Sequence, residues 1–365
     1  MKTFHCQFCG NPIFFENVQC LRCGSALAFL PDRLNMAAIE PVPERQGLWR
    51  PRSRGARADA LPRYRQCENH TSRNACNFAV PEDDPNPLCP SCRLTRVIPD
   101  LSQPENPQRW YRLEVAKRRL FYTLAKLGLL ASSPSGGRAD GPWFEFLADQ
   151  PGQPVLTGHA DGVITINVAE ADDEERVRRR IAMHEPYRTL LGHLRHESGH
   201  YYWDRLVAGG GREASFRALF GDERRDYAQA LQEHYARGGT VPGWQQQYVT
   251  EYATAHPWED WAETWAHYLH MVDLLETAAS YNTRVSVRGQ ADGEVEEVVN
   301  PLETGLPRFD ALVEQWVPLT LLVNSLNRSL GQEDAYPFAL SSGALEKLRY
   351  VHDVISAHRG PQGAA

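Results

Sequence analysis

The chain has 365 residues, of which 42% are hydrophobic, so it is long enough to bury a large core beside small accessory modules. Its 46 acidic side chains outnumber its 39 lysines and arginines, and the net charge of −7 disfavours general binding to nucleic acids or membrane surfaces. No apolar run reaches the length of a transmembrane helix, and the first residues lack the apolar segment of a secretory signal peptide.

All eight cysteines lie near the N-terminus, in two sets of four. In the first set, two C-x2-C pairs are separated by ten residues, a spacing that is typical of a zinc ribbon. Gly10 and Gly24 follow the two pairs, where a tight turn requires a conformationally permissive residue. The sequence therefore predicts a zinc ribbon over residues 1–30 that holds one structural Zn²⁺. Its ligands would be Cys6, Cys9, Cys20 and Cys23.

Residues 31–66 are predicted to be a loop or linker, because this stretch is rich in proline, glycine and alanine. Between Arg45 and Arg65 it carries seven arginines and a single acid, Asp59. Such a segment could contact nucleic acid or an acidic partner, but basic runs are common and unspecific. We therefore favour a plain linker, and nucleic-acid binding stays a possibility without support from other features.

The second cysteine set is less regular, with spacings of eight, twelve and two residues. It predicts a second zinc module over residues 67–100, in which His70 could replace one of the cysteines. A framework of disulfides is the rival interpretation. Without a signal peptide, thiolates held on zinc in a reducing cytoplasm are the simpler account. The preferred ligands of this second structural Zn²⁺ are Cys67, Cys76, Cys89 and Cys92.

Helices and short strands are predicted after the cysteine modules. Residues 109–130 form a long amphipathic helix, and residues 143–147 and 163–168 are candidate strands. In the second strand, the alternation places Ile164 and Ile166 on one face, toward a core. Two further helices are expected over residues 307–330 and 341–358, with a disordered tail after residue 359.

The residues His196-Glu197-Ser198-Gly199-His200 spell H-E-x-x-H within a run of helically spaced apolar residues. This run begins at Glu185-Pro186 and ends at the glycines 209–211. On a helix, His196 and His200 lie on one face, where they could hold a Zn²⁺ with open positions for water and substrate. Glu197 could then take a proton from the metal-activated water. The sequence thus predicts a catalytic zinc site.

A third protein ligand is needed to complete such a site. The metzincin pattern would require a histidine where the chain has Leu206, and Asp204 is expected on the helix surface or as a side chain that supports a ligand. A better candidate region is 256–270, an aromatic helix that starts at Pro257 and carries Glu259 and Glu263 on one face. The residues alone leave these two carboxylates as alternatives.

The motif Glu-x-x-Ala-Glu after H-E-x-x-H resembles the glutamate-zincins, particularly their lethal-factor-like branch. The resemblance implies that Glu259 is the third zinc ligand and that Glu263 holds a histidine ring. It also implies that Tyr252 lies near the scissile carbonyl group. In such enzymes an edge strand before the active helix pairs with extended substrate, which suggests residues 163–168 for this role.

Nearly the whole chain is similar to bacterial proteins that combine an N-terminal zinc ribbon with a zinc-binding metallopeptidase domain. This resemblance implies a zincin-like domain over residues 105–360. The matching segments are Phe4-x-Cys6-x2-Cys9-Gly10, Phe15-Glu16-Asn17-x2-Cys20-x2-Cys23-Gly24, Cys76-Asn77, Ile98-Pro99-Asp100-Leu101 and the blocks 196–204 and 256–270.

Together, these features predict an α+β protein: a mostly helical zincin-like domain with a small sheet, preceded by two small zinc-ribbon-like modules. The expected activity is that of a cytoplasmic zinc metallopeptidase, which hydrolyses a peptide or related amide bond with Glu197 as general base and one catalytic and two structural zinc ions. The expected partner is a peptide or protein substrate, with a further protein partner possible at the ribbons. Alternatives are a non-catalytic zinc-binding adaptor and a regulator that binds nucleic acid or protein through the ribbons.

Overall fold

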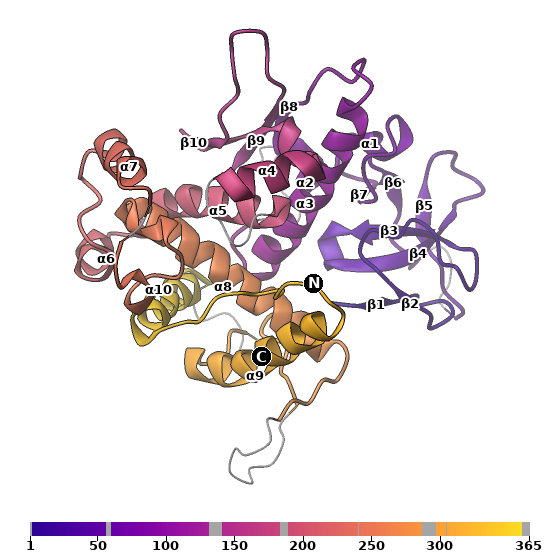
Figure 1. The fold of residues 1–365 in the computed structure, drawn as a ribbon. Coiled ribbons are helices and arrows are strands. Elements are labelled where there is room, and N and C mark those ends of the chain that lie inside the picture. The colour runs from indigo at the N-terminus through magenta and orange to yellow at the C-terminus, as the bar shows by residue number, and fades with distance from the viewer. Residues whose placement is uncertain are drawn as a thin grey trace. The chain divides into compact units, whose positions relative to one another are not determined.

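We describe the protein from a computed structural model that defines residues 2–55, 60–130, 141–182, 189–239, 241–286, 297–303 and 305–359 (Figure 1). The chain forms two compact units, Met1–Glu175 and Arg176–Ala365, and each is described by itself. No described helix is long and apolar enough to cross a membrane.

The N-terminal unit contains a five-stranded antiparallel sheet with its strands in sequence order. Three of these strands lie within residues 31–66, so the prediction of a linker there is wrong. The apolar run 36–39 is buried in the sheet, and Arg50 pairs with Glu40 at 2.9 Å instead of facing solvent alone. The strands are β3 (Ala26–Leu30), β4 (Asn35–Pro41), β5 (Trp49–Pro51), β6 (Tyr64–Gln66) and β7 (Ala79–Pro81).

This sheet joins the two cysteine sets in one unit. The first set surrounds the small hairpin of β1 (Phe4–His5) and β2 (Pro12–Ile13) and leads into β3. The second set begins directly after β6 and includes two short helices, α1 (Glu68–Thr71) and α2 (Pro90–Arg93). Phe29 of β3 also forms a bridge with Phe78, the residue just before β7. The two cysteine sets are therefore not separate modules on a flexible connection.

A second sheet has the order β10 (Gly158–Ala160), β11 (Val163–Asn167), β9 (Trp143–Leu147) and β8 (Thr95–Val97). It confirms the predicted strands, and Ile164 and Ile166 are buried as expected. However, β11 lies between β10 and β9, so its prediction as an edge strand is wrong. The chain reverses at Asp161 and Gly162, which both have positive φ, and β10 thereby covers the side that was expected to be free.

Helix α3 (Asn106–Lys126) confirms the predicted long amphipathic helix, but it begins three residues earlier and ends four residues earlier than predicted. The helix ends early because Gly128 adopts a φ of +71°, which breaks the helical geometry. Its buried face contacts the ribbon region: Tyr122 packs edge-on against Phe4 and Phe15, with ring centroids 6.3 and 5.7 Å apart. Arg119 forms an ion pair with Glu16 at 2.6 Å. Helix α3 is therefore an integral part of the N-terminal unit.

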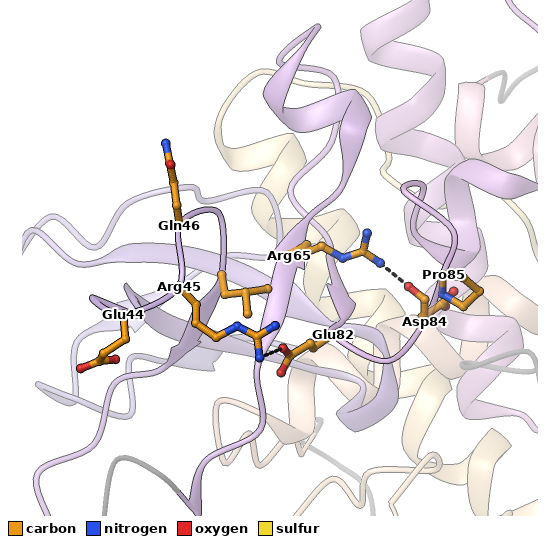
Figure 2. A pocket seen from close by; sticks show the side chains of 8 residues that line it. Glu44, Arg45, Gln46, Arg65, Glu82, Asp84 and Pro85 are labelled. Carbon is orange, nitrogen blue, oxygen red and sulfur yellow. Dashed lines mark hydrogen bonds and ion pairs between the residues drawn. The ribbon is translucent and has the colours of Figure 1, made fainter.

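A pocket of about 460 Å³ opens beside β6 and β7, and most of its lining is charged (Figure 2). Arg45 pairs with Glu82 at 2.8 Å, and the guanidinium of Arg65 donates a hydrogen bond to the backbone carbonyl of Asp84. Two arginines of the predicted basic linker are thus engaged with neighbouring groups of the same unit. Of these two contacts, the ion pair with Glu82 neutralises the charge of Arg45.

The C-terminal unit is helical in its described part. Its helices confirm those predicted around the H-E-x-x-H motif, around Glu259 and over the last part of the chain. The predicted helix start at Glu185-Pro186 and the tail after residue 359 lie outside the described residues. The helices are α5 (Leu190–Tyr202) with a π-helical extension (Trp203–Ala208), α6 (Glu213–Phe220), α7 (Tyr227–Ala236), α8 (Pro257–Ala279), α9 (Phe309–Ser329) and α10 (Ser342–Arg359); α4 (Asp173–Ala182) spans the unit boundary.

Helix α8 occupies the interior of this unit, with Trp261 and Trp265 fully buried. It packs against α5, α9 and α10. Its Asp260 forms a buried ion pair with Lys347 of α10 at 2.6 Å. Together with the ribbon region, this helical unit confirms the predicted α+β class.

Candidate metal centres

Helix α5 presents the two histidines of the H-E-x-x-H motif on one face. The helix begins after Thr189, whose hydroxyl oxygen accepts a hydrogen bond from the backbone N–H of Gly192 at 2.9 Å. One turn apart, the rings of His196 and His200 have centroids separated by 5.0 Å. Helix α8 begins with His256 as its cap and Pro257 in its first turn.

The two helices approach each other closely at Gly199. A Cβ atom at this position would lie 2.9 Å from the Cα of Ala262, so a larger residue would push the helices apart. The indole N–H of Trp261 donates to the carbonyl of Gly199 at 2.8 Å, and that of Trp265 donates to the Ser198 hydroxyl at 3.1 Å. These contacts fix the first turn of α8 opposite the histidines.

Glu259 completes a group of three side chains that could hold a metal ion. One of its oxygens, Oε2, lies 3.0 Å from Nε2 of His196, and Oε1 lies 3.5 Å from Nε2 of His200. Tetrahedral zinc with bonds near 2.0 Å separates its ligand atoms by roughly 3.3 Å, so these distances fit such a site. The Oε2 atom is also buried without a hydrogen-bond partner among the described residues, which leaves its lone pairs free for a cation.

Two further side chains support this group. Oε1 of Glu263 lies 2.6 Å from Nδ1 of His196, so it can accept the ring N–H and direct Nε2 toward the other two side chains. The hydroxyl of Tyr227 donates a hydrogen bond of 2.6 Å to Oε1 of Glu259. Sequence reasoning missed Tyr227, because it stands on α7 and no spacing pattern connects it to a glutamate on α8.

The charges of the group stabilise one another. Burial alone would raise the pKa of Glu259, but His200, His196 and the Tyr227 hydroxyl outweigh it and lower the pKa to about 2. Burial would likewise lower the pKa of His196, whereas Glu259 and Glu263 raise it well above its usual value. The two carboxylates therefore favour a positive charge at the histidines, and the histidines keep the carboxylate of Glu259 ionised.

Glu197 and Tyr252 lie beside the three converging side chains, and their side-chain oxygens make no hydrogen bond with the described residues. Glu197 is only 5% exposed, yet it makes no hydrogen bond or ion pair with the residues that the structure describes. The ring of Tyr252 lies 6.0 Å from that of His196, and its hydroxyl likewise lacks a hydrogen bond within the described part of the chain. Asp204, in contrast, is exposed and does not belong to the converging group.

Each cysteine set also converges on one point. The sulfur atoms of Cys6 and Cys23 are 3.8 Å apart, and those of Cys9 and Cys20 are 3.6 Å apart. A zinc ion with four bonds of 2.3 Å would separate its sulfur ligands by roughly 3.8 Å, whereas a disulfide would bring them to about 2 Å. All eight cysteines are free thiols, so both sets fit a tetrahedral zinc ion.

His70 lies close to the second set without joining it. Its Nδ1 atom is 2.7 Å from the backbone carbonyl oxygen of Cys76, which indicates a hydrogen bond to the main chain. The group that converges consists of Cys67, Cys76, Cys89 and Cys92, as preferred from the sequence.

Comparisons with known proteins agree with this geometry. A zinc-ribbon domain model matches residues 3–103, and the family described as "Putative zinc-binding metallo-peptidase" matches residues 106–354. Uncharacterized proteins of Mycobacterium bovis and Mycobacterium tuberculosis are each 41% identical over 361 residues, which cover 97% of this chain and 95% of each relative. No solved structure matches the chain at a significant level. The resemblance expected from the cysteine and histidine motifs is thereby confirmed, and the chain belongs to the metallo-peptidase family so described.

Proposed function

We propose that the protein hydrolyses a peptide or related amide bond at the site formed by His196, His200 and Glu259. The observation that carries this proposal is the convergence of His196, His200 and Glu259 on one point, with Glu197 next to His196 and without a hydrogen-bond partner among the described residues. Because no other described residue engages its carboxylate, Glu197 can act as a base beside the three converging side chains. A zinc ion bound at the site would polarise the substrate carbonyl group and lower the pKa of a water molecule.

Side chains of the protein would supply proton transfer, ligand orientation and charge stabilisation. Glu197 would accept a proton from the attacking water on a carboxylate oxygen and then deliver it to the leaving nitrogen. Glu263 would keep the ring of His196 in the tautomer that has Nε2 free. The hydroxyl of Tyr252 would donate a hydrogen bond to the oxygen of the scissile carbonyl group as negative charge develops on that oxygen.

The proposal includes three zinc ions per chain, one at the histidine site and one at each cysteine set. Metal analysis of protein purified without chelators should therefore find about three equivalents of zinc. A value near one, with thiols that react readily, would contradict the zinc assignment of the cysteine sets. The free thiols also fit a reducing compartment, so we place the protein in the cytoplasm.

The decisive experiment compares the wild type with Glu197→Gln on a panel of generic peptides. Glutamine keeps the shape of the side chain but cannot act as the base, so hydrolysis should be lost while fold and zinc content are retained. Turnover like that of the wild type at equal zinc content would rule out this mechanism. An inactive wild type with full zinc would instead favour a non-catalytic zinc-binding protein. Profiling of new N-termini in cells with each form would then identify cleaved proteins.

A further inference from the structure

A buried guanidinium group lies beside the second cysteine set. Arg118 of α3 is only 2% exposed, and its Nη1 donates a hydrogen bond of 2.6 Å to the carbonyl of Ala75, the residue before Cys76. Its Nε atom is buried without a hydrogen-bond partner in the described part of the chain. No carboxylate of the described residues forms an ion pair with Arg118, so its positive charge needs another source of compensation.

The second cysteine set is enclosed on all sides. Each of its four cysteines is at most 4% exposed, so water cannot solvate a charge there. Backbone N–H groups of Phe78, Cys89 and Cys92 point at its sulfur atoms over 3.3–3.4 Å, an arrangement that favours thiolates. Four thiolates on one Zn²⁺ carry a net charge of about minus two, and burying that charge without a counter-charge is unfavourable.

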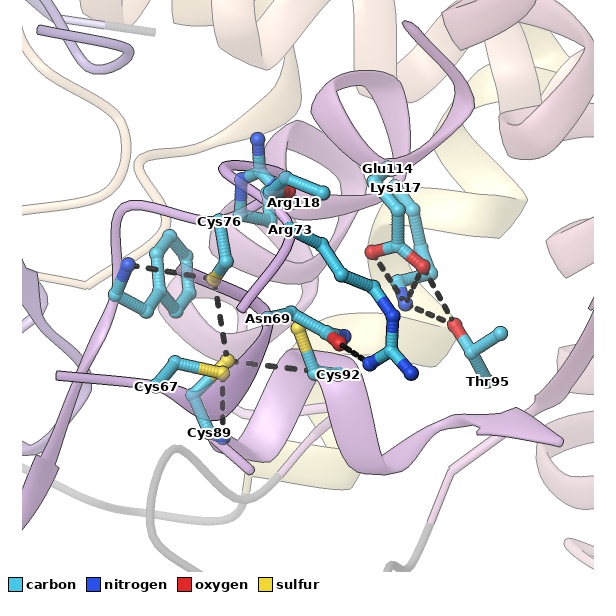
Figure 3. Close-up of polar contacts among 12 residues, drawn as sticks. Cys67, Asn69, Arg73, Cys76, Cys89, Cys92, Thr95, Glu114, Lys117 and Arg118 are labelled. Carbon is cyan, nitrogen blue, oxygen red and sulfur yellow. Dashed lines mark hydrogen bonds and ion pairs between the residues drawn. The ribbon is translucent and has the colours of Figure 1, made fainter. Parts of the chain in front are cut away.

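The other buried cation of α3 is already neutralised (Figure 3). Lys117 forms an ion pair with Glu114 at 2.8 Å and also donates a hydrogen bond to Thr95. Burial alone would lower the pKa of Arg118, but Cys76 and Glu114, followed by the other nearby thiols, outweigh this effect and raise it. Of the two buried cations of α3, Arg118 is thus the one whose charge interacts with the cysteines of the second set.

We propose that Arg118 is the counter-charge that allows a buried four-thiolate zinc centre to form at Cys67, Cys76, Cys89 and Cys92. The zinc-ribbon model ends at residue 103, so a residue outside the ribbon completes this centre. The first cysteine set differs, because Cys9 and Cys23 are partly exposed and water can solvate their charge. Removal of Arg118 should therefore weaken the second centre and leave the first unchanged.

The test uses the full-length protein with the substitutions Arg118→Met, Arg118→Lys and, as a matched control, Arg119→Met. Arg119 is the next residue of α3 but pairs with Glu16 on the surface. Zinc transfer to a chromogenic chelator is followed while alkylation and mass spectrometry identify which cysteines become reactive. We expect Arg118→Met to release zinc from the second set about 10–100-fold faster or to lack it, because supporting groups commonly change metal affinity by that factor. Arg118→Lys, which keeps the charge, should lie closer to the wild type.

Equal zinc content and equal release from the second set in Arg118→Met and the wild type would overturn the proposal. If Arg118→Met does not fold, it is combined with Cys92→His, because a neutral imidazole in place of a thiolate removes one negative charge from the centre. A double variant, Arg118→Met with Cys92→His, that regains fold and zinc supports the role of charge. A double variant that stays unfolded, while Cys92→His alone folds with zinc, shows that Arg118 acts by packing and refutes the proposal.

Discussion

The hydroxyl of Tyr227 lies 2.6 Å from Oε1 of Glu259 and donates a hydrogen bond to it, so a residue of α7 holds the carboxylate that faces both histidines. The same carboxylate keeps its Oε2 atom free of hydrogen bonds among the described residues. Tyr227 thereby determines which oxygen of Glu259 is available to a metal ion.

Replacement of Tyr227 by phenylalanine should weaken zinc binding at the histidine site, because the carboxylate of Glu259 loses its fixed orientation. We expect a loss of roughly 10–100-fold in affinity, the usual effect of removing such a supporting group. Competition with a chelator of known affinity measures it, and the zinc ions of the cysteine sets serve as an internal reference. Tyr281→Phe, at an exposed tyrosine, is the control. Unchanged affinity in Tyr227→Phe would show that the hydrogen bond is dispensable.

Glu259 and Glu263 should respond differently to alanine substitution. Glu259→Ala removes the carboxylate that faces both histidines and should abolish zinc binding at this site, with the cysteine sets still loaded. Glu263→Ala removes only the acceptor for Nδ1 of His196 and should weaken binding by about 10–100-fold. X-ray absorption at the zinc edge can report the ligand atoms of the histidine site. The cysteine sites must hold another metal in this experiment, so that only the histidine site contributes to the zinc signal. Loss of zinc in Glu263→Ala but not in Glu259→Ala would reverse the two roles.

Zinc binding at the histidine site should release a proton. Because Glu259 and Glu263 raise the pKa of His196, the metal-free ring should keep its proton to a higher pH than an ordinary histidine, and zinc must displace this proton to reach Nε2. Affinity should consequently rise by about tenfold per pH unit below that raised pKa. Calorimetry in buffers of different ionisation enthalpy measures the number of protons released. Glu263→Gln should reduce the release, and the same release in both proteins would mean that Glu263 does not set the protonation of His196.

Gly199→Ala tests whether the close approach of α5 and α8 builds the site. The added methyl group would lie 2.9 Å from the Cα of Ala262, and overpacking of this kind costs about 1–3 kcal/mol. We expect a lower unfolding midpoint in denaturant and weaker zinc binding at the histidine site. Gly158→Ala is the control, because a methyl group there meets nothing within 4 Å. A variant that matches the wild type in both measurements would show that the helices can adjust.

Local spacing in the sequence was sufficient to select the cysteines and histidines that converge in the structure. The cysteine pairs and the two histidines of H-E-x-x-H lie within a turn or a knuckle of one another, so their geometry follows from the local backbone. Glu259 was preferred over Glu263 with the help of a family resemblance, and Glu259 is the carboxylate that converges with the two histidines.

Features that depend on distant segments were missed. Tyr227 reaches Glu259 from another helix, and no periodicity in either segment indicates the contact. The strands within residues 31–66 were not predicted, because a segment rich in arginine and proline is typical of a linker. The pairing of these strands also depends on β3 and β7, which lie outside the segment. The interior position of β11 likewise depends on a reversal at Asp161 and Gly162 that brings β10 against its free side.

The contact between Arg118 and the carbonyl before Cys76 also bears on how the protein matures during synthesis. The first four cysteines leave the ribosome within one short segment, so a zinc ion can be bound there while most of the chain is still unmade. The surroundings of the second set are assembled only after α3 has emerged, because Arg118 is contributed from that helix. On the proposed role of Arg118, the second set would hold its metal securely only once α3 has been made, although Tyr122 of the same helix also completes the packing around the first set.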